Sequence, residues 1–221
     1  MKEAGEMVPV GVIADDDRDR LLASRWVARF FPGGLHSSDL LIISGPPSAA
    51  RIALVEGCRG TVIWLPSGWI AGEGPIVAAT GHELGSDAAI APAIELTRHG
   101  SHAVVLAHVW AMPSLGVVEL PQDPWGIGSI PDGQAAALQA FASRVQATAP
   151  DVSVTAVVRQ GAHVARELLA IAPAVQAVVV GRLRAHGARQ RLGTVARELL
   201  ELGRCPVVIA PSTGIARDLR P

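Results

Sequence analysis

From residue 75 onward, short apolar runs rich in β-branched residues alternate with segments whose apolar residues recur at helical spacing. This alternation predicts βαβ units and hence a parallel sheet with helices on its faces. Five strands are expected, at Pro75–Thr80, Ala103–Val109, Val152–Val158, Val175–Val180 and Pro206–Ala210. Four helices are expected between them, at Ser86–His99, Gln134–Thr148, Ala162–Ala170 and Thr194–Leu202. The pattern therefore predicts an α/β fold with a doubly wound, five-stranded parallel sheet.

Prolines interrupt the pattern at two places. Pro92 lies inside the first expected helix, so that helix either bends there or begins later than Ser86. Residues 112–133 contain four prolines and no periodic pattern, which predicts a long loop.

The first 74 residues contain a shorter version of the same pattern. Ser37–Gly45 (SSDLLIISG) is similar to Ala174–Gly181 (AVQAVVVG), and Cys58–Gly68 (CRGTVIWLPSG) is similar to Cys205–Gly214 (CPVVIAPSTG). The glycine and the cysteine are 13 residues apart in the first copy and 24 apart in the second. Two βα units of any α/β protein share some likeness, but this spacing favours an internal repeat whose first copy has lost the loop after its strand.

A strand at Val8–Ala14 and a helix at Asp19–Phe30 are expected ahead of these segments. Together the elements predict a partial α/β repeat over residues 1–72, followed by a full domain over residues 73–214.

The composition narrows the setting in which such a fold works. Hydrophobic residues make up 49% of the 221 and charged residues 18%, which is typical of a well-packed globular chain. The formal net charge of −1 gives no general attraction to nucleic acid or to an anionic membrane. The apolar runs are too short to cross a bilayer, acidic residues appear early at the N-terminus, and only two cysteines occur. We therefore expect a cytoplasmic protein with neither nucleic acid nor a membrane as partner.

The clearest candidate site lies in residues 178–200, VVVGRLRAHGARQRLGTVARELL. A buried strand ends at Gly181, a loop with four arginines follows, and Gly193-Thr194 opens a helix. Glycines let a ligand approach the backbone, and the free N–H groups of a helix start attract anions. Thr194 is expected to cap the helix or to bind a phosphate oxygen. The segment matches neither the P-loop nor the Rossmann fingerprint, so a solvated basic loop before an ordinary helix is the alternative.

The order of these features resembles the C-terminal unit of the universal stress protein family. The residues that carry the likeness are VVVG (Val178–Gly181), the glycine-bearing loop, Gly193-Thr194 with its helix, and CPVVIAPS (Cys205–Ser212). The segment Gly74–Trp110 is likewise similar to the family's first strand, first helix and second strand. The resemblance implies an adenine nucleotide alpha hydrolase-like fold. In the nucleotide-binding branch of the family, the pattern G-x2-G-x9-G-[ST] contacts the phosphates and ribose of ATP.

By this resemblance, Gly181 matches the first glycine of the pattern, and Gly193 with Thr194 matches its end. Gly187 lies in the loop between them, and Val109 stands near the end of the second strand, where the family's adenine pocket takes backbone contacts. The resemblance implies that these residues bind ATP or a related adenine nucleotide, with or without Mg²⁺.

Two positions depart from the family pattern. Arg184 stands where the second glycine is expected, and the loop is one residue shorter than the pattern. Arg184 would either fill the space of a phosphate or bind one. Thr80 stands where the family has an aspartate that hydrogen-bonds the nucleotide. A threonine can still form a hydrogen bond but offers no negatively charged acceptor, so this contact would be weaker.

Other polar residues favour structural roles. The acidic cluster at residues 15–19 could ligate Mg²⁺ or touch a nucleotide, but a strand end followed by a helix N-cap explains it. His82 could reach a phosphate, although a solvent-facing loop position is favoured. Cys58 and Cys205 are expected to be small hydrophobic residues ahead of edge strands. No catalytic triad or metal-ligand spacing is present, so no enzymatic activity is expected.

Three functions stay open on these residues. The first is a nucleotide-binding stress-response protein that signals through its oligomeric state. The second is an interaction or dimerisation module of the same fold that has lost the nucleotide. The third, a slow ATP hydrolase or an adenylate-using enzyme, lacks a visible general base or metal carboxylates at the loop.

The resemblance also implies how the chain associates. Family domains commonly form dimers through their last strands, which predicts a homodimer or an intrachain pseudo-dimer. In the second case Thr61–Leu65 pairs with Pro206–Ala210, and both strand edges are covered.

Overall fold

The computed structural model describes residues 11–30, 40–81, 88–100, 103–110, 130–172, 174–182 and 192–211. Two runs of elements are present, which we call the N-terminal unit (residues 11–65) and the C-terminal unit (residues 76–211). The N-terminal unit consists of β1 (Gly11–Ile13), α1 (Asp17–Phe30), β2 (Leu40–Ser44), α2 (Ala49–Gly57) and β3 (Thr61–Leu65). The C-terminal unit consists of β4 (Ile76–Ala79), α3 (Ile90–Gly100), β5 (Val104–Trp110), α4 (Ile130–Thr148), β6 (Val154–Gln160), α5 (Val164–Leu169), β7 (Ala177–Gly181), α6 (Thr194–Leu202) and β8 (Val207–Ala210).

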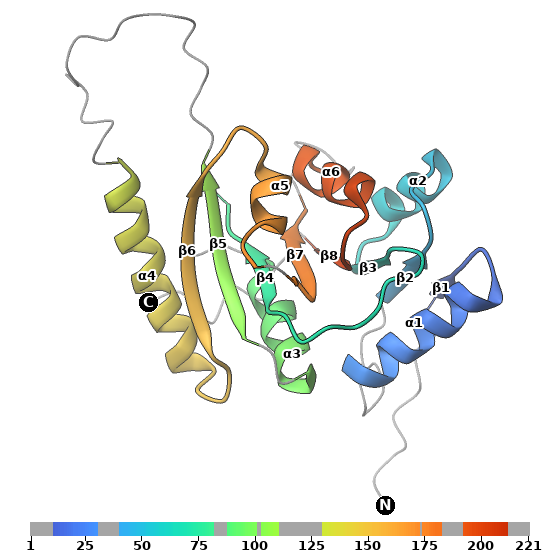
Figure 1. Cartoon of the computed structure of the whole chain (residues 1–221), viewed down its shortest axis with the longest axis horizontal. Coiled ribbons are helices and arrows are strands. Elements are labelled where there is room, and N and C mark those ends of the chain that lie inside the picture. Colours follow the sequence, from blue (N-terminus) through green and yellow to red (C-terminus); the bar gives the residue numbers. More distant parts are fainter. Residues whose placement is uncertain are drawn as a thin grey trace, which may run out of the picture.

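The strands of both units join one sheet, in the order β1-β2-β3-β8-β7-β4-β5-β6 (Figure 1). Within the C-terminal unit five parallel strands follow the order β8-β7-β4-β5-β6, which confirms the doubly wound arrangement. The five-stranded sheet predicted from the sequence is only one part of a larger sheet. Because β8 also pairs with β3, the N-terminal unit extends the sheet to eight strands among the described residues.

The two units meet at β3 and β8, which pair antiparallel. The register joins Val62 to Ile209, Ile63 to Val208 and Trp64 to Val207. This is the pairing that the sequence predicted for Thr61–Leu65 and Pro206–Ala210. When Pro66 is aligned with Pro211, Ile63 becomes the counterpart of Val208, so the central pair of the register lies on a local twofold axis.

The pairing changes the surroundings of both cysteines. The described edges of the sheet are β1 and β6, so β3 and β8 are interior strands. Cys58 and Cys205 therefore do not precede edge strands, and that part of the prediction is wrong. The positions of the cysteines do not indicate which strands are paired, because both cysteines precede their strands and neither is a paired residue.

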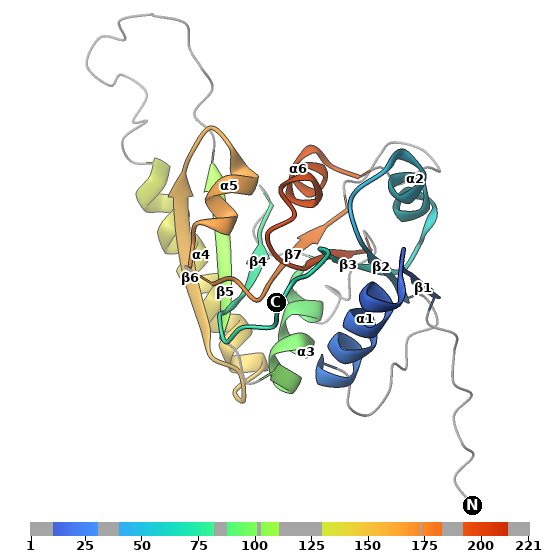
Figure 2. The same ribbon diagram turned by 45° about the vertical axis from the view of Figure 1, so that its right-hand side comes forward.

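Alternate residues along the strands supply two hydrophobic cores. Helices α1, α3 and α4 cover one face of the sheet, and α2, α5 and α6 cover the other (Figure 2). On β3, for example, Ile63 belongs to the first core and its neighbour Trp64 to the second, each 1% exposed. Each core contains residues of both units, so the burial of apolar surface couples the folding of one unit to the other.

The helix ends follow from local chemistry. α3 begins at Ile90, so Pro92 lies in its first turn, where a missing N–H costs nothing, and the later start is correct. α4 begins at Ile130, ahead of the predicted Gln134. α6 has the predicted bounds, and it ends at Gly203, whose φ of 54° is readily adopted by glycine. None of the described helices is both long and apolar enough to span a membrane.

The connection from β3 to β4 is fastened to both units. The N–H of Gly72 donates to Oε1 of Gln176 (2.8 Å), just ahead of β7, and Arg29 of α1 donates to the carbonyl oxygen of Gly72 (3.2 Å). At Gly74 a Cβ atom would collide with the carbonyl group of Ala174, so this close approach of two backbones requires glycine.

Candidate functional site

The candidate site lies where the order of the C-terminal strands reverses. From β4 the chain crosses to β5 on one side, and β7 and β8 lie on the other side. In such sheets ligands bind outside the carboxyl ends of the strands at this switch point. The register pairs Ala78 with Val179, which places Thr80 level with Gly181 on the neighbouring strand. Ala79 pairs with Ala107, so Val109 reaches the same edge from β5.

Thr80 is buried at this edge and its hydroxyl is already engaged. The residue is 8% exposed, and its N–H donates to the carbonyl oxygen of Ala107 (2.8 Å). Its Oγ1 donates to the same oxygen (3.2 Å). The hydroxyl proton is thus used inside the sheet, and Oγ1 is left as an uncharged acceptor for a ligand donor.

His108 is a buried polar neighbour that the sequence analysis missed. It is 8% exposed on β5, and its Nδ1 lies 3.4 Å from the carbonyl oxygen of Thr80. A carbonyl only accepts, so Nδ1 carries the proton in this pair. The signal was present, because His108 is the single polar residue in the apolar run Ala103–Trp110.

Among the described residues, no side chain caps the start of α6. Gly193 is the N-cap, with no side-chain hydrogen bond, and Thr194 is the first helical residue with an exposed side chain. The prediction that Thr194 caps the helix is therefore wrong, because Gly193 occupies that position. A helix start without a capping side chain favours a bound anion, since its first N–H groups have no partner within the helix.

Gly181 leaves room at the switch point rather than allowing a special backbone conformation. Its φ is outside the left-handed region. A Cβ atom there would lie 3.8 Å from the Cβ of Ala88, just ahead of α3, which is an ordinary contact. Gly181 therefore places no side chain of its own at the ends of β4 and β7. Arg184, Gly187 and His82 lie outside the described residues, so the structure does not place them.

The equivalent edge of the N-terminal unit is filled by the chain itself. Ile13 pairs with Ile43, which places Asp15 level with Gly45, as Thr80 is level with Gly181. The guanidinium of Arg51 forms an ion pair with Asp15 and donates to the carbonyl oxygen of Pro46 (2.8 Å). The Arg51 side chain is 9% exposed, so a cation of the protein occupies this crevice.

The rest of the acidic cluster is structural, as expected. The side chain of Asp16 accepts the N–H of Asp19 (2.7 Å) at the start of α1, which is an N-terminal capping interaction. The described residues contain no group of three or more side chains suited to hold a metal ion.

Comparison with known proteins agrees with this architecture. The sequence model of the universal stress protein family matches residues 74–211. The chain belongs to the universal stress protein family. The match covers the whole C-terminal unit, including Thr80, Gly181 and Gly193. A comparison with curated proteins gave no match.

Three solved structures of proteins assigned to the family are similar to this chain. A protein of Pseudomonas aeruginosa UCBPP-PA14 assigned to the family is 12% identical, with a TM-score of 0.50 over 90% of this chain and 81% of that one. A universal stress protein from Archaeoglobus fulgidus DSM 4304 is 13% identical, with a TM-score of 0.49 over 77% of this chain. The present chain spans 60% of the length of that protein. A family member from Burkholderia pseudomallei is 20% identical, with a TM-score of 0.46 over 64% of this chain and 99% of that one.

Proposed function

We propose that this universal stress protein is a stress-response protein that binds one adenine nucleotide, ATP or a close relative, at the carboxyl edge of β4 and β7. The observation that carries the proposal is that Thr80 and Gly181 lie level at the switch point of the sheet, at the edge from which the chain leads to the Gly193 start of α6. That edge has a glycine and a polar acceptor, and the helix that follows begins with N–H groups that favour negative charge.

Each described residue has a role in this proposal. Backbone groups of Val109 hold the adenine, and Oγ1 of Thr80 accepts a hydrogen bond from the nucleoside. Gly181 admits the phosphates, and the N–H groups of Gly193 and Thr194 bind them. From the sequence, Arg184 and Gly187 belong to the loop that encloses the phosphates. If Mg²⁺ binds, it arrives with the nucleotide and is held by the phosphates, as is usual for this ion.

The proposal includes a stoichiometry of one nucleotide per chain. The Arg51 side chain occupies the equivalent edge of the N-terminal unit and lies close against Gly45, which leaves no room there for a second nucleotide. We assign no catalytic role to the site. The Thr80 hydroxyl already donates a hydrogen bond within the sheet, and the His108 ring faces a backbone carbonyl. Neither side chain is therefore placed to act as a general base.

A second candidate is an interaction module of the same fold without a nucleotide. One observation favours it: at the position of the family's aspartate, Thr80 offers only an uncharged oxygen whose hydroxyl proton is already in use. On this alternative, the mass and stability of the protein are the same with and without nucleotide.

The test begins with the purified protein. Absorbance at 260 and 280 nm, followed by chromatography of the denatured supernatant, detects a nucleotide that is carried through purification. Isothermal titration with ATP and Mg²⁺ then measures affinity and stoichiometry in the nucleotide-free protein. We expect one site per chain. Absence of heat and of any thermal shift at millimolar ATP would establish the interaction module instead, and measurable turnover of ATP would contradict the non-enzymatic role.

A further inference from the structure

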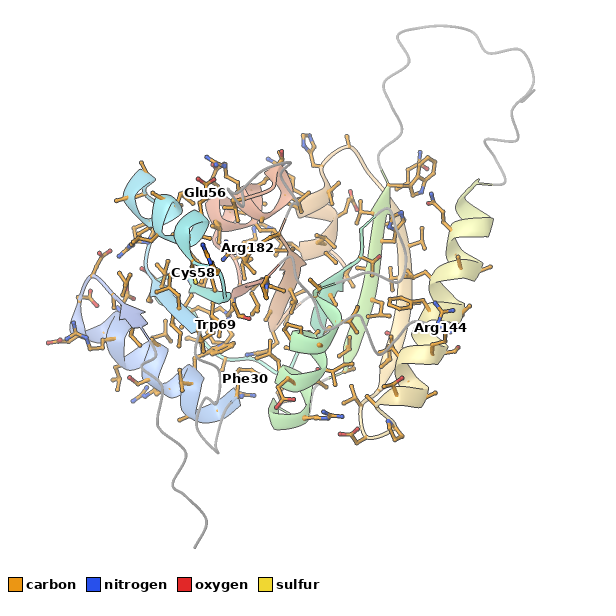
Figure 3. The ribbon with its side chains drawn as sticks, turned by 180° about the vertical axis from the view of Figure 1, so that it is seen from behind. Phe30, Glu56, Cys58, Trp69, Arg144 and Arg182 are labelled. Carbon is orange, nitrogen blue, oxygen red and sulfur yellow. The ribbon has the colours of Figure 1, made fainter. Side chains whose placement is uncertain are left out.

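The end of α2 contacts the chain on both sides of residues 183–191, which connect β7 to α6. Arg182 follows β7 directly and donates from Nη1 to the carbonyl oxygen of Val55 (2.7 Å) and from Nη2 to that of Gly60 (3.3 Å). Leu192 lies just ahead of α6, and its N–H donates to Oε1 of Glu56 (3.4 Å). Figure 3 shows Glu56 and Arg182 together where α2 faces α6. One short segment of the N-terminal unit therefore holds both flanks of this connection.

The antiparallel pairing of the units explains why α2 reaches this place. α2 ends just before β3, and the start of β3 lies beside the carboxyl end of β8. The carboxyl end of β8 lies beside that of β7, and Arg182 is the first residue after β7. The end of α2 is thus brought to the edge at which the C-terminal unit has its candidate site.

Arg182 is a buried cation whose recorded hydrogen-bond acceptors are the backbone carbonyls of Val55 and Gly60. It is 7% exposed, and its Nε has no hydrogen-bond partner among the described residues. Burial lowers the pKa of Arg182 from its ordinary value. Two carbonyl oxygens offset this cost: that of Val55 in the last turn of α2, where a helix carries partial negative charge, and that of Gly60 just beyond the helix. Since a buried charge without partners is strongly destabilising, Arg182 fixes the chain after β7.

Glu56 fixes the other flank. The same oxygen that accepts the Leu192 N–H also accepts Nη2 of Arg197 on α6 (3.1 Å). The Glu56 side chain is 33% exposed, so it is partly withdrawn from water. Glu56 thus joins α2 to the backbone ahead of α6 and to a side chain within its first turns.

We propose that residues Val55–Gly60, which we call the α2 clamp, position the two flanks of the 183–191 connection and thereby set the affinity of the nucleotide site. The inference rests on the proposed nucleotide binding. The N-terminal unit receives no matching support from α6. In the place of Arg182, the residue after Gly45 is Pro46, which has neither an N–H nor a charged side chain to donate to α6. The N-terminal unit therefore acts on the site of the C-terminal unit as a positioning element, without touching the ligand.

The test compares full-length Glu56→Ala with Glu201→Ala. Glu201 is an exposed glutamate on α6 that forms no hydrogen bond or ion pair with α2 among the described residues. Hydrogen exchange over peptides containing Leu192–Leu199 reports on the flank without any ligand, and isothermal titration with ATP reports on affinity. We expect Glu56→Ala to exchange faster and to bind ATP about five- to tenfold more weakly, the effect of one hydrogen bond of ordinary strength. Glu56→Gln, which keeps an acceptor oxygen, should lie between the two, and Glu201→Ala should behave as the wild type.

The outcomes separate this inference from the proposed function. Unchanged exchange in Glu56→Ala overturns the clamp, whatever the affinity. Faster exchange with unchanged affinity overturns its link to the site. Faster exchange in a protein whose wild type binds no ATP supports the clamp as a structural device and overturns the nucleotide proposal.

Discussion

At the residue scale, Gly45 and Gly181 end equivalent strands but are glycines for different reasons. Gly45 has a φ of 112°, and a Cβ atom there would lie 2.5 Å from Nη1 of Arg51. Gly181 has neither constraint, since among the described residues a Cβ atom there would meet only Ala88, at 3.8 Å. We expect Gly45→Ala to lower the free energy of unfolding by about 2 kcal/mol or more, because strain and collision act together. Gly181→Ala should change it by less than about 1 kcal/mol. Urea denaturation measures both.

Gly133→Ala is the control for this pair, because nothing lies within 4 Å of a Cβ atom at that helical position. Equal losses at Gly45 and Gly181 would contradict the filled crevice in the N-terminal unit. The bulkier Gly181→Val adds a test of the site: it should weaken ATP binding by about tenfold or more, because its side chain enters the space proposed for the phosphates.

The two cysteines should differ sharply in reactivity. Cys205 is 3% exposed, and burial raises its pKa to about 12, so the nucleophilic thiolate is almost absent at neutral pH. Cys58 is partly exposed at the end of α2. We expect iodoacetamide at pH 8 to add one label to the folded protein, on Cys58, and a second only after unfolding. Mass spectrometry of tryptic peptides identifies the labelled thiol, and Cys58→Ser should abolish native labelling. Native labelling of Cys205 would contradict its burial.

Cys205 also predicts the alkaline limit of stability. Its pKa is raised in the folded state from an ordinary value of 9.0, so its contribution is complete below pH 9 and is lost as the pH rises towards 12. The loss is up to about 1.4 kcal/mol per pH unit. The sequence has no tyrosine and a single lysine, Lys2, so few other groups titrate in this range. Denaturation at several pH values should show the decline, and Cys205→Ala should flatten it.

At the scale of elements, the pairing of β3 with β8 joins the two units, and each hydrophobic core continues across it. Ile63 lies at the centre of the register and is 1% exposed. Ile63→Glu buries a charge between the units and should cost about 4 kcal/mol or more, lowering the melting of the whole chain in one transition. Ile63→Ala, at about 2–5 kcal/mol, gives the same test if the charged variant does not fold.

Ile70→Glu is the matched control, because Ile70 is 86% exposed in the connection between the units. It should shift stability by no more than about 0.5 kcal/mol. Calorimetry that showed a separate, unshifted transition for the C-terminal unit in Ile63→Ala would contradict the shared cores.

The sequence predicted most elements because their signals are local. The bounds of α6 follow from the Gly193-Thr194 start and the Gly203 stop, and the apolar run at β8 marks its strand. The contacts of the α2 clamp could not be predicted in this way. Arg182 and Val55 are separated by 127 positions in the chain, and their hydrogen bond exists only because β3 and β8 are antiparallel. The use of the Thr80 hydroxyl within the sheet depends likewise on strand register, which the residue pattern does not encode.

At the scale of the molecule, the local twofold axis through Ile63 and Val208 relates two units of unequal content. In the C-terminal unit the sheet continues beyond β4 to β5 and β6, whereas the described part of the N-terminal unit ends at β1. The two candidate edges therefore face opposite ends of the sheet, one at Gly181 and one that is occupied by the Arg51 side chain. In this arrangement the smaller unit covers the strand edge of the larger one and supplies the clamp for its site.

This asymmetry predicts both the mass and the stoichiometry of the protein. Because β3 already covers β8, a second chain cannot pair through that strand, and we expect a monomer of 22.9 kDa by light scattering, with or without ATP. The same solution should bind one ATP per chain by titration. Arg51→Ala should not create a second site, because the helix start next to Gly45, that of α2, is already capped by the side chain of Ser48. A mass of two chains would place dimerisation at β1 or β6, and two nucleotides per chain would contradict the filled crevice. A monomer with a single site would identify the N-terminal unit as an internal substitute for the partner subunit.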